Sequence, residues 1–176
     1  IESSKAVTQA RAVIRAMVDP AALEHALIRC DRLLTEGRFV EGEVRSVDSD
    51  GVGLAHGPRN EADYIALAIG SSNLAPCRSN NGDVDALSAA SAKWPSRLIA
   101  AHSVAIIGAD AVGTELSGEI ASAMPNKRVI FFSSGDALFP GSPTKVGVSL
   151  RRKFKAMDVE VVLGDRFEHL LTRDTP

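Results

Sequence analysis

The amino-acid sequence predicts an α/β fold with a parallel sheet in the C-terminal half of the chain. Three short runs rich in Val, Ile and Phe have the composition of buried strands, at 103–108, 128–136 and 159–165. Two segments typical of helices, 111–124 and 144–157, separate these runs. This β-α-β-α-β order predicts a parallel sheet, because each helix returns the chain to the same end of the sheet.

The first of the two helices has apolar residues at four-residue spacing. They are Val112, Leu116, Ile120 and Met124, and Pro125 follows directly. A helix with this spacing packs its apolar stripe on the sheet, and the proline ends it. We therefore expect these four side chains to face the core.

The N-terminal part predicts a second, mixed unit. A helix is expected over Ser3–Val18, where the apolar residues recur at three- and four-residue spacing, and a shorter one over 20–28. Alternating Val44 and Val47 with a turn at Asp50-Gly51 predict a β-hairpin. The apolar run Asp63–Gly70 predicts a strand buried on both faces, packed against that hairpin.

A polar, turn-rich segment, 71–83, predicts a crossing between two structural units, and a helix is expected at 84–94. The expected division is a partial first unit at 1–75, a linker with a helix at 76–101, and a partial second unit at 102–176.

Composition restricts the classes of function. The chain has 176 residues, 45% of them hydrophobic, and a formal net charge of −2, so we expect no nucleic-acid partner. Cys30 and Cys77 form no CxxC pair and the four histidines share no ligand spacing, so no metal site is expected. No apolar run approaches the roughly 18 residues of a membrane span, and no signal peptide is recognisable. An intracellular protein, in the cytoplasm or an organelle, is expected.

One short run is strongly basic. The residues Arg151–Lys155 read RRKFK and lie within the second expected helix. Such a run can touch an anionic surface, but a solvated helix face is the favoured interpretation.

The stretch from Gly108 to Gly113 resembles the glycine-rich turn of a dinucleotide-binding fold. In that turn the first glycine makes the strand-to-helix reversal, the second lets the backbone approach a pyrophosphate, and the third lets the helix pack closely on the strand. The three places here hold Gly108, Asp110 and Gly113. The two glycines that build the fold are kept and the one that approaches the ligand is replaced, which favours a retained Rossmann scaffold.

Asp110 places a carboxylate where an anionic pyrophosphate would lie, and its side chain is also suited to cap the helix. The end of the second strand gives no clearer evidence of nucleotide binding. Sites selective for NAD have a carboxylate there and those for NADP often have an arginine, but this chain has Ser133-Ser134. Asp136 is expected to begin the following loop.

Four segments, taken in order, resemble a known family. They are "RCDRLL…GRFVEGEVRSVDSDGVGLAHG", "YIALAIGSS", "VAIIGADAVGTELSGEIASAMPNKRVIFFSSGDALFP" and "KVGVSLRRKFKAMDVEVVLGDRF". Together they resemble the flavin-dependent pyridine nucleotide-disulfide oxidoreductases, most closely the apoptosis-inducing-factor-like branch that includes the ferroptosis-suppressor quinone reductases.

The resemblance implies a Rossmann-like NAD(P)-domain half and part of an FAD-domain-like unit that contains the hairpin. It also implies FAD and NAD(P)H as cofactors. The chain departs from the family in two substitutions, Asp110 and an ATG motif that reads Ala68-Ile69-Gly70. The family's N-terminal flavin-binding strand and its C-terminal return segment are not recognisable, so we expect this segment alone to be inactive and to bind no FAD.

Site residues follow from the resemblance. The positions near the nicotinamide nucleotide are Gly108, Ala109, Asp110, Gly113 and Glu115, and those near the flavin are Val44 and Gly70. For Glu115, a solvated acid in the first turns of the helix is an equally good interpretation. For Val44 a core strand residue, and for Gly70 a plain strand-end turn, are the favoured ones.

Two functions remain open. The first is a portion of an FAD-dependent NAD(P)H oxidoreductase that passes electrons from a nicotinamide nucleotide through flavin to a quinone-like acceptor. The second is a degenerate, non-catalytic accessory subunit of a larger respiratory or photosynthetic membrane complex, with other subunits as partners and a place peripheral to the membrane.

Overall fold

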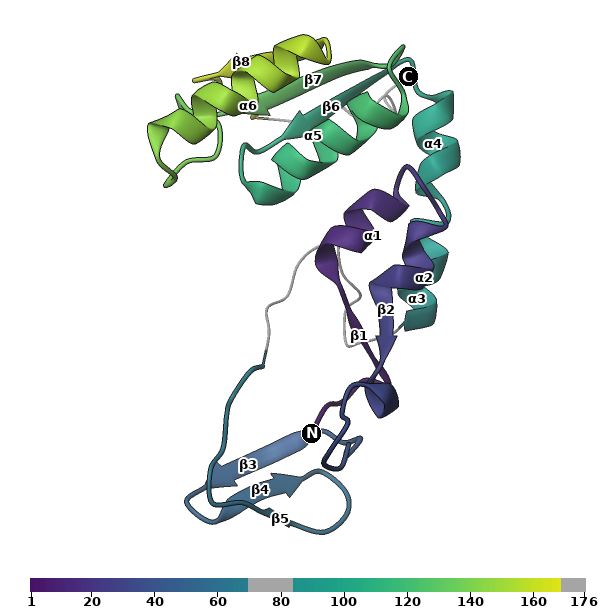
Figure 1. Ribbon diagram of the computed structural model, residues 1–176, viewed down its shortest axis with the longest axis vertical. Helices are drawn as coiled ribbons and strands as arrows, with labels where there is room; N and C mark the ends of the chain where they lie inside the picture. The colour runs from purple at the N-terminus through teal and green to yellow at the C-terminus, as the bar shows by residue number, and fades with distance from the viewer. Residues whose placement is uncertain (70–83, 169–176) are drawn as a thin grey trace. The chain divides into compact units, whose positions relative to one another are not determined.

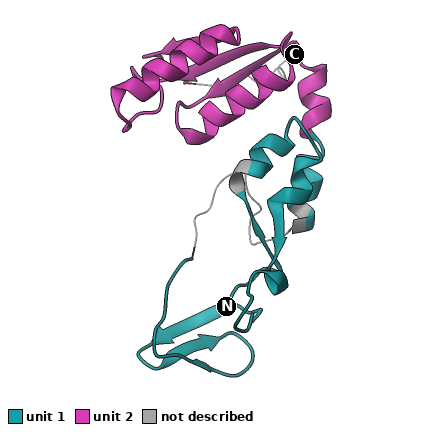
Figure 2. Ribbon diagram, in the orientation of Figure 1, with its two compact units in different colours: residues 1–93 teal, residues 94–176 magenta. Residues whose placement is uncertain are grey.

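The computed structural model describes residues 1–69 and 84–168. The chain divides into two compact units, residues 1–93 and residues 94–176, which Figure 2 colours teal and magenta.

The second unit contains the predicted parallel sheet (Figure 1). Its strands β6 (Ser103–Ile107), β7 (Arg128–Ser133) and β8 (Val159–Leu163) lie in the order β6-β7-β8, and both pairs are parallel. The α/β fold class and the β-α-β-α-β order predicted from the sequence are therefore confirmed.

Helices α5 (Ala111–Ala123) and α6 (Thr144–Ala156) cover the same face of this sheet. The fully buried Phe131 of β7 contacts both helices. Its ring meets the ring of Phe154 on α6 edge to face, with centroids 5.5 Å apart, and also lies against the position of Gly113 on α5. This aromatic pair fixes both helices on the central strand.

The predicted apolar stripe of α5 is confirmed only at Ile120, which is buried. Val112 is 39% exposed, and Leu116 and Met124 are only half-buried. The buried residues of the helix are instead Gly113, Thr114, Ser117, Ile120 and Ala121. Most of these side chains are small, because α5 lies close to the sheet and a larger side chain would not fit there.

The predicted helix at 84–94 is shorter than expected and is followed by another. Helix α3 covers Val84–Ser91 in the first unit, and α4 covers Trp94–Ala100 in the second. Pro95 lies in the first turn of α4, where its missing N–H is tolerated. Lys127 Nζ donates to the carbonyls of Ile99 (3.1 Å) and Ala101, which ties the end of α4 to the start of β7.

The N-terminal helix predicted over Ser3–Val18 is wrong over residues 3–9. Strand β1 (Ala6–Thr8) precedes α1 (Ala10–Ala16), because Val7 pairs with Ile28 in an antiparallel ladder. The helix expected at 20–28 likewise divides into α2 (Ala22–Ala26) and β2 (Leu27–Arg29), followed by a short 3-10 turn. Both errors arise because pairing with a distant strand overrides local helical periodicity.

The predicted β-hairpin is confirmed. Strands β3 (Val44–Asp48) and β4 (Gly51–Leu54) are antiparallel, and β5 (Asn60–Glu61) adds a third strand beside β4. Gly51 is required at the turn because its φ is +152° and a Cβ there would lie 2.2 Å from the Asn60 carbonyl oxygen.

The strand predicted at Asp63–Gly70 is wrong over its described part. Residues 63–69 form no strand, and Tyr64 and Ile69 are 96% and 94% exposed. An apolar run becomes a strand only where another strand offers hydrogen bonds, and among the described residues none pairs with this segment. It lies near the hairpin, since residues of both line one cavity of ≈ 440 Å³. Gly70 itself lies outside the described residues.

Candidate functional site

The turn between β6 and α5 is the candidate nucleotide-binding site, and Gly108 begins it. Gly108 has a φ of +111°, a conformation that disfavours any residue with a Cβ. A Cβ there would meet nothing within 4 Å, so the requirement for glycine is conformational and not steric. The Gly108 N–H donates to the Phe132 carbonyl at 2.8 Å, which extends the pairing of β6 with β7 into the turn.

Gly113, in the first turn of α5, is required for a different reason. A Cβ at this position would lie 2.0 Å from the Gly108 carbonyl oxygen and 3.2 Å from the Phe131 ring. Real Cβ atoms do not approach backbone oxygen so closely, so helix and turn pack together only with glycine here. The first and third glycine positions therefore have the roles expected from their spacing.

Asp110 is the N-cap residue of α5. Its backbone is extended (φ −81°, ψ −169°), and its Oδ1 accepts a hydrogen bond from the Gly113 N–H at 3.0 Å. Its carbonyl accepts the first intrahelical bond, from the Thr114 N–H at 3.1 Å. The side chain thus satisfies one of the N–H groups that a helix N-terminus otherwise offers to an anion.

The neighbouring predicted residues have structural contacts. Ala109 is buried, and its carbonyl accepts a hydrogen bond from the Phe139 N–H at 2.9 Å, which holds the loop after β7 against the turn. Glu115 is half-buried on α5, one turn beyond Asp110. Val44 begins β3 in the first unit and is 42% exposed.

The structure brings together five of the predicted residues. Gly108, Ala109, Asp110 and Gly113 form the turn and the start of α5, and Glu115 follows on the same helix. Of the two positions assigned to the flavin, Gly70 lies outside the described residues.

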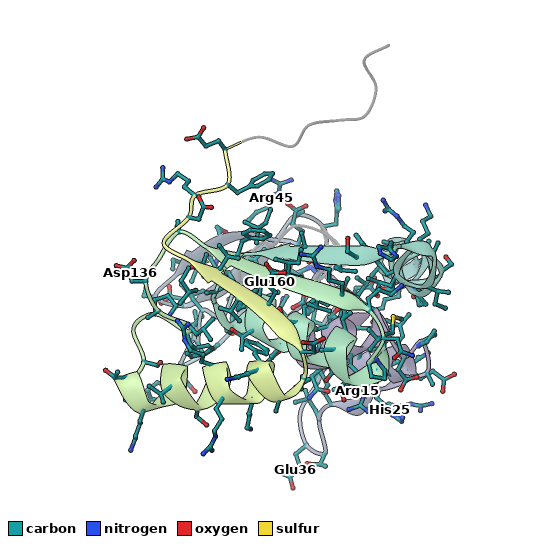
Figure 3. The ribbon with its side chains drawn as sticks, turned by 90° about the horizontal axis from the view of Figure 1, so that it is seen from above. Arg15, His25, Glu36, Arg45, Asp136 and Glu160 are labelled. Carbon is teal, nitrogen blue, oxygen red and sulfur yellow. The ribbon has the colours of Figure 1, made fainter. Side chains whose placement is uncertain are left out.

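At the end of β7 the Ser133 side chain is engaged in its own turn. Its Oγ accepts a hydrogen bond from the Gly135 N–H at 3.2 Å. Asp136 lies in the loop after β7, as expected, and is exposed (Figure 3). Its Oδ1 lies 3.3 Å from the place that a Cβ would take at Gly164, so it is directed toward the end of β8.

Sequence reasoning missed a hollow at the carboxyl end of the sheet. A cavity of ≈ 410 Å³ is lined by Phe132, Asp165, Arg166, Phe167 and Glu168. The Asp165 N–H donates to the Ser133 carbonyl at 3.2 Å, so the segment after β8 continues along β7. Ligands of open α/β sheets bind at this edge, and the run Asp165–Glu168, which begins at the last residue of the third expected strand, could have indicated it.

The turn fits a dinucleotide in backbone shape and not in its polar groups. Gly108 and Gly113 give the close approach of helix and strand that the fold requires. The Asp110 carboxylate, however, holds the Gly113 N–H and adds negative charge where two phosphate charges would lie. Tight binding of a pyrophosphate therefore does not fit the residues present.

Among the described residues, the groups with shifted pKa values belong to the first unit. A hydrogen bond from Arg29 lowers the pKa of the Asp31 carboxyl, and one from Arg59 lowers that of Asp48. Burial raises the pKa of the Cys30 thiol, whose Sγ donates to the Ser4 carbonyl at 3.4 Å. In the part of the chain that is described, no three His, Cys, Asp or Glu side chains are grouped so that they could hold a metal ion.

Comparison with known proteins gives consistent results. The family model for pyridine nucleotide-disulphide oxidoreductases matches residues 4–175. Apoptosis-inducing factor homolog A of Dictyostelium discoideum is 28% identical over 96% of this chain and 43% of its own length. Homolog B of the same organism is 29% identical over 87% of this chain and 42% of its own length.

A solved structure has a similar fold. The water-forming NADH oxidase from Lactobacillus brevis, bound to NADH, superposes with a TM-score of 0.55 at 14% identity, over 94% of this chain and 40% of the oxidase. The chain spans less than half the length of each curated relative named above. Since the family model covers nearly every residue and the glycine turn and parallel sheet agree with it, the chain belongs to the pyridine nucleotide-disulphide oxidoreductase family.

Proposed function

We propose that this chain forms part of an FAD-dependent NAD(P)H oxidoreductase that passes electrons from a nicotinamide nucleotide through flavin to a quinone-like acceptor. The observation that carries the proposal is the family match over residues 4–175, together with the turn at Gly108 and Gly113 in the expected place. Flavin, when bound, supplies the capacity to take up a hydride and release electrons one or two at a time.

Within that function the second unit supplies a scaffold. The glycines of the turn hold the N-terminus of α5 against the end of β6, which is where an open α/β sheet presents a ligand. Asp110 keeps this N-terminus capped, so we propose that its own affinity for the nucleotide is weak. Residues 1–75 and 102–176 are proposed as partial FAD-domain-like and NAD(P)H-domain-like units.

The Asp110 cap also favours a second function. A carboxylate that replaces the ligand-approach glycine, next to intact packing glycines, is the pattern expected when the fold is kept and nucleotide binding is lost. The second candidate is therefore a non-catalytic accessory subunit of a larger electron-transfer complex, located inside the cell. No helix of the described residues is long and apolar enough to cross a membrane.

The two candidates differ in bound flavin. The full-length protein that contains this chain should be purified, its visible absorption spectrum recorded, and quinone reduction followed with NADH and with NADPH. The oxidoreductase predicts a flavin spectrum and nucleotide-dependent turnover. A colourless protein without turnover would contradict it and would support the accessory subunit. In the same assay, we expect the 176-residue chain alone to be colourless and inactive.

A further inference from the structure

Helix α6 carries an unusual concentration of positive charge. Its 13 residues contain five cations, Lys145, Arg151, Arg152, Lys153 and Lys155, and no acid. All five are exposed. The formal net charge of −2 for the chain is therefore the sum of +5 on α6 and −7 on all other residues.

Three of the five cations lie on the outer face of the helix. Phe154 is buried against the sheet, and opposite to it Lys145, Val148, Arg152 and Lys155 follow one another at three- and four-residue spacing. Figure 3 shows nitrogen-tipped side chains that project from α6 away from the sheet. Val148 lies within this row and is 65% exposed. We call these five cations and Val148 the α6 basic face.

Helix stability accounts for only part of this arrangement, since it favours Lys153 and Lys155 in the last turn and not the other three cations. Lys145 lies in the first turn, where the helix dipole disfavours a cation. Arg151 and Lys155 are four residues apart, a spacing at which like charges repel. Among the described residues, no ion pair is formed by any of the five cations.

A hollow continues the α6 basic face. Arg151 and Lys155 line a cavity of ≈ 910 Å³ together with Lys127 and Arg128 from the start of β7. Two acids, Asp158 and Glu160, also line it, and Glu160 pairs with Arg128 at 2.9 Å. The four cations outnumber the acids, so the cavity keeps a positive charge and can admit a phosphate group.

We propose that the α6 basic face docks on an anionic phospholipid bilayer, with lipid phosphates entering the hollow beside Arg151 and Lys155. A row of unpaired cations with one exposed apolar side chain matches a diffuse negative surface, which attracts Lys and Arg through charge alone. Hot spots of protein interfaces combine Arg with Trp and Tyr, and single-stranded nucleic acids stack on aromatic rings. The α6 basic face exposes no aromatic side chain.

Vesicle co-sedimentation of the 176-residue chain tests the proposal. Vesicles of phosphatidylcholine alone are compared with vesicles that also contain phosphatidylserine, at roughly 0.1 M salt and again at several-fold higher salt. The test variant is Arg152→Gln/Lys155→Gln. The matched control is Lys5→Gln/Arg32→Gln, which removes two exposed cations from the first unit. Circular dichroism checks that both variants are folded.

The expected result is binding to phosphatidylserine vesicles only, which weakens at high salt. Since each basic residue near such a surface contributes about five-fold, the test variant should bind roughly 25-fold more weakly and the control should bind nearly as the parent chain does. The proposal would be overturned if the chain did not bind anionic vesicles, or if the test and control variants lost vesicle affinity equally. Tighter binding to an acidic peptide or to DNA than to vesicles would also overturn it. None of these outcomes depends on flavin or turnover.

Discussion

The Asp110 carboxylate accepts the Gly113 N–H at 3.0 Å, at the helix end where a dinucleotide would place its phosphates. The Asp110 side chain therefore satisfies the backbone N–H of Gly113. Its negative charge also disfavours the binding of a dinucleotide, the ligand for which the backbone of the turn is shaped. Two fixed negative charges about 4 Å apart repel by about 1 kcal/mol in water and about 4 kcal/mol at a protein surface. Because Asp110 is exposed, the lower value applies more closely.

The cap itself predicts a stability change at this residue. Asp110→Ala removes the acceptor for the Gly113 N–H and should lower the free energy of unfolding by about 1 kcal/mol. Asp110→Asn and Asp110→Ser keep an acceptor and should remain within a few tenths of a kcal/mol of the parent chain. Urea denaturation of the three variants measures this. Equal stability of the Ala and Asn variants would contradict the cap.

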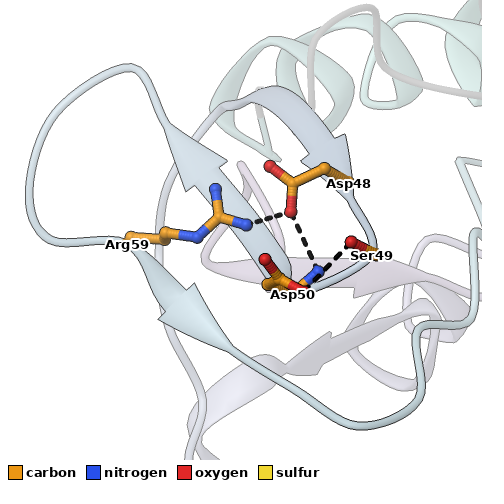
Figure 4. Close-up of polar contacts among 4 residues, drawn as sticks. All are labelled: Asp48, Ser49, Asp50 and Arg59. Carbon is orange, nitrogen blue, oxygen red and sulfur yellow. Dashed lines mark hydrogen bonds and ion pairs between the residues drawn. The ribbon is translucent and has the colours of Figure 1, made fainter.

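Asp48 gives a second prediction at the residue scale. Figure 4 shows Arg59 and the Asp50 N–H directed at one carboxylate oxygen of Asp48, the latter at 3.0 Å. The hydrogen bond from Arg59, and then that from Asp50, lower the pKa of the Asp48 carboxyl. Arg59→Gln should raise this pKa toward its ordinary value, as followed by NMR titration of the carboxyl carbon.

The Asp48 carboxyl makes the stability of the fold depend on pH. Since the folded-state pKa of Asp48 is lowered, its contribution to stability is complete above the unfolded-state pKa of about 3.9 and is lost as the pH falls through the folded-state value. Both side chains are solvated, so the contribution is small. Arg45→Gln is the control, because Arg45 pairs with Glu43. An Asp48 titration that Arg59→Gln leaves unchanged would contradict the assignment.

Among the elements, α5 is the one whose packing depends most on a missing side chain. Gly113 and Gly118 lie on the same helix, but only a Cβ at Gly113 would meet backbone, at 2.0 Å, while one at Gly118 would meet nothing within 4 Å. Gly113→Ala should therefore destabilise by about 2 kcal/mol or more, because α5 must move away from the turn. Gly118→Ala should stabilise by about 0.5 to 1 kcal/mol.

Thermal and urea unfolding of the two glycine variants test this packing. The free energy of unfolding should fall in Gly113→Ala and rise in Gly118→Ala, although both variants add one methyl group to the same helix. If the two variants changed the free energy of unfolding in the same direction, α5 would not lie against the Gly108 carbonyl. The role assigned to Gly113 would then be wrong.

The elements also show how far the sequence predicts the fold. The three parallel strands and their two helices were predictable because each has a local pattern and short connections. The strand at Ala6–Thr8 was missed and the one at Asp63–Gly70 was wrongly expected, because a strand depends on partners distant in sequence. The stripe on α5 was misplaced because close packing at Gly113, and not apolar spacing, sets which side faces the sheet.

At the scale of the whole molecule, the candidate site was predictable in outline and not in detail. The spacing of Gly108 and Gly113 located the turn, and the residue type at Asp110 made a cap one of two interpretations. The bond from the Phe139 N–H to the Ala109 carbonyl was not predictable, since loop conformation depends on the assembled sheet. The chain also matches less than half of each curated relative, so its electron acceptor stays a proposal.

The central claim is that the turn from Gly108 to Gly113 is a Rossmann scaffold in which Asp110 takes the place of the ligand. Calorimetric titration of NADH and NADPH into the parent chain and into Asp110→Gly tests it most directly, with Asp110→Asn to separate charge from the freed Gly113 N–H. Relief of repulsion and recovery of one donor predict weak binding by the parent and binding at least about ten-fold tighter by the glycine variant, since about 1.4 kcal/mol is a factor of ten. Equal affinities, or micromolar binding by the parent chain, would contradict the claim.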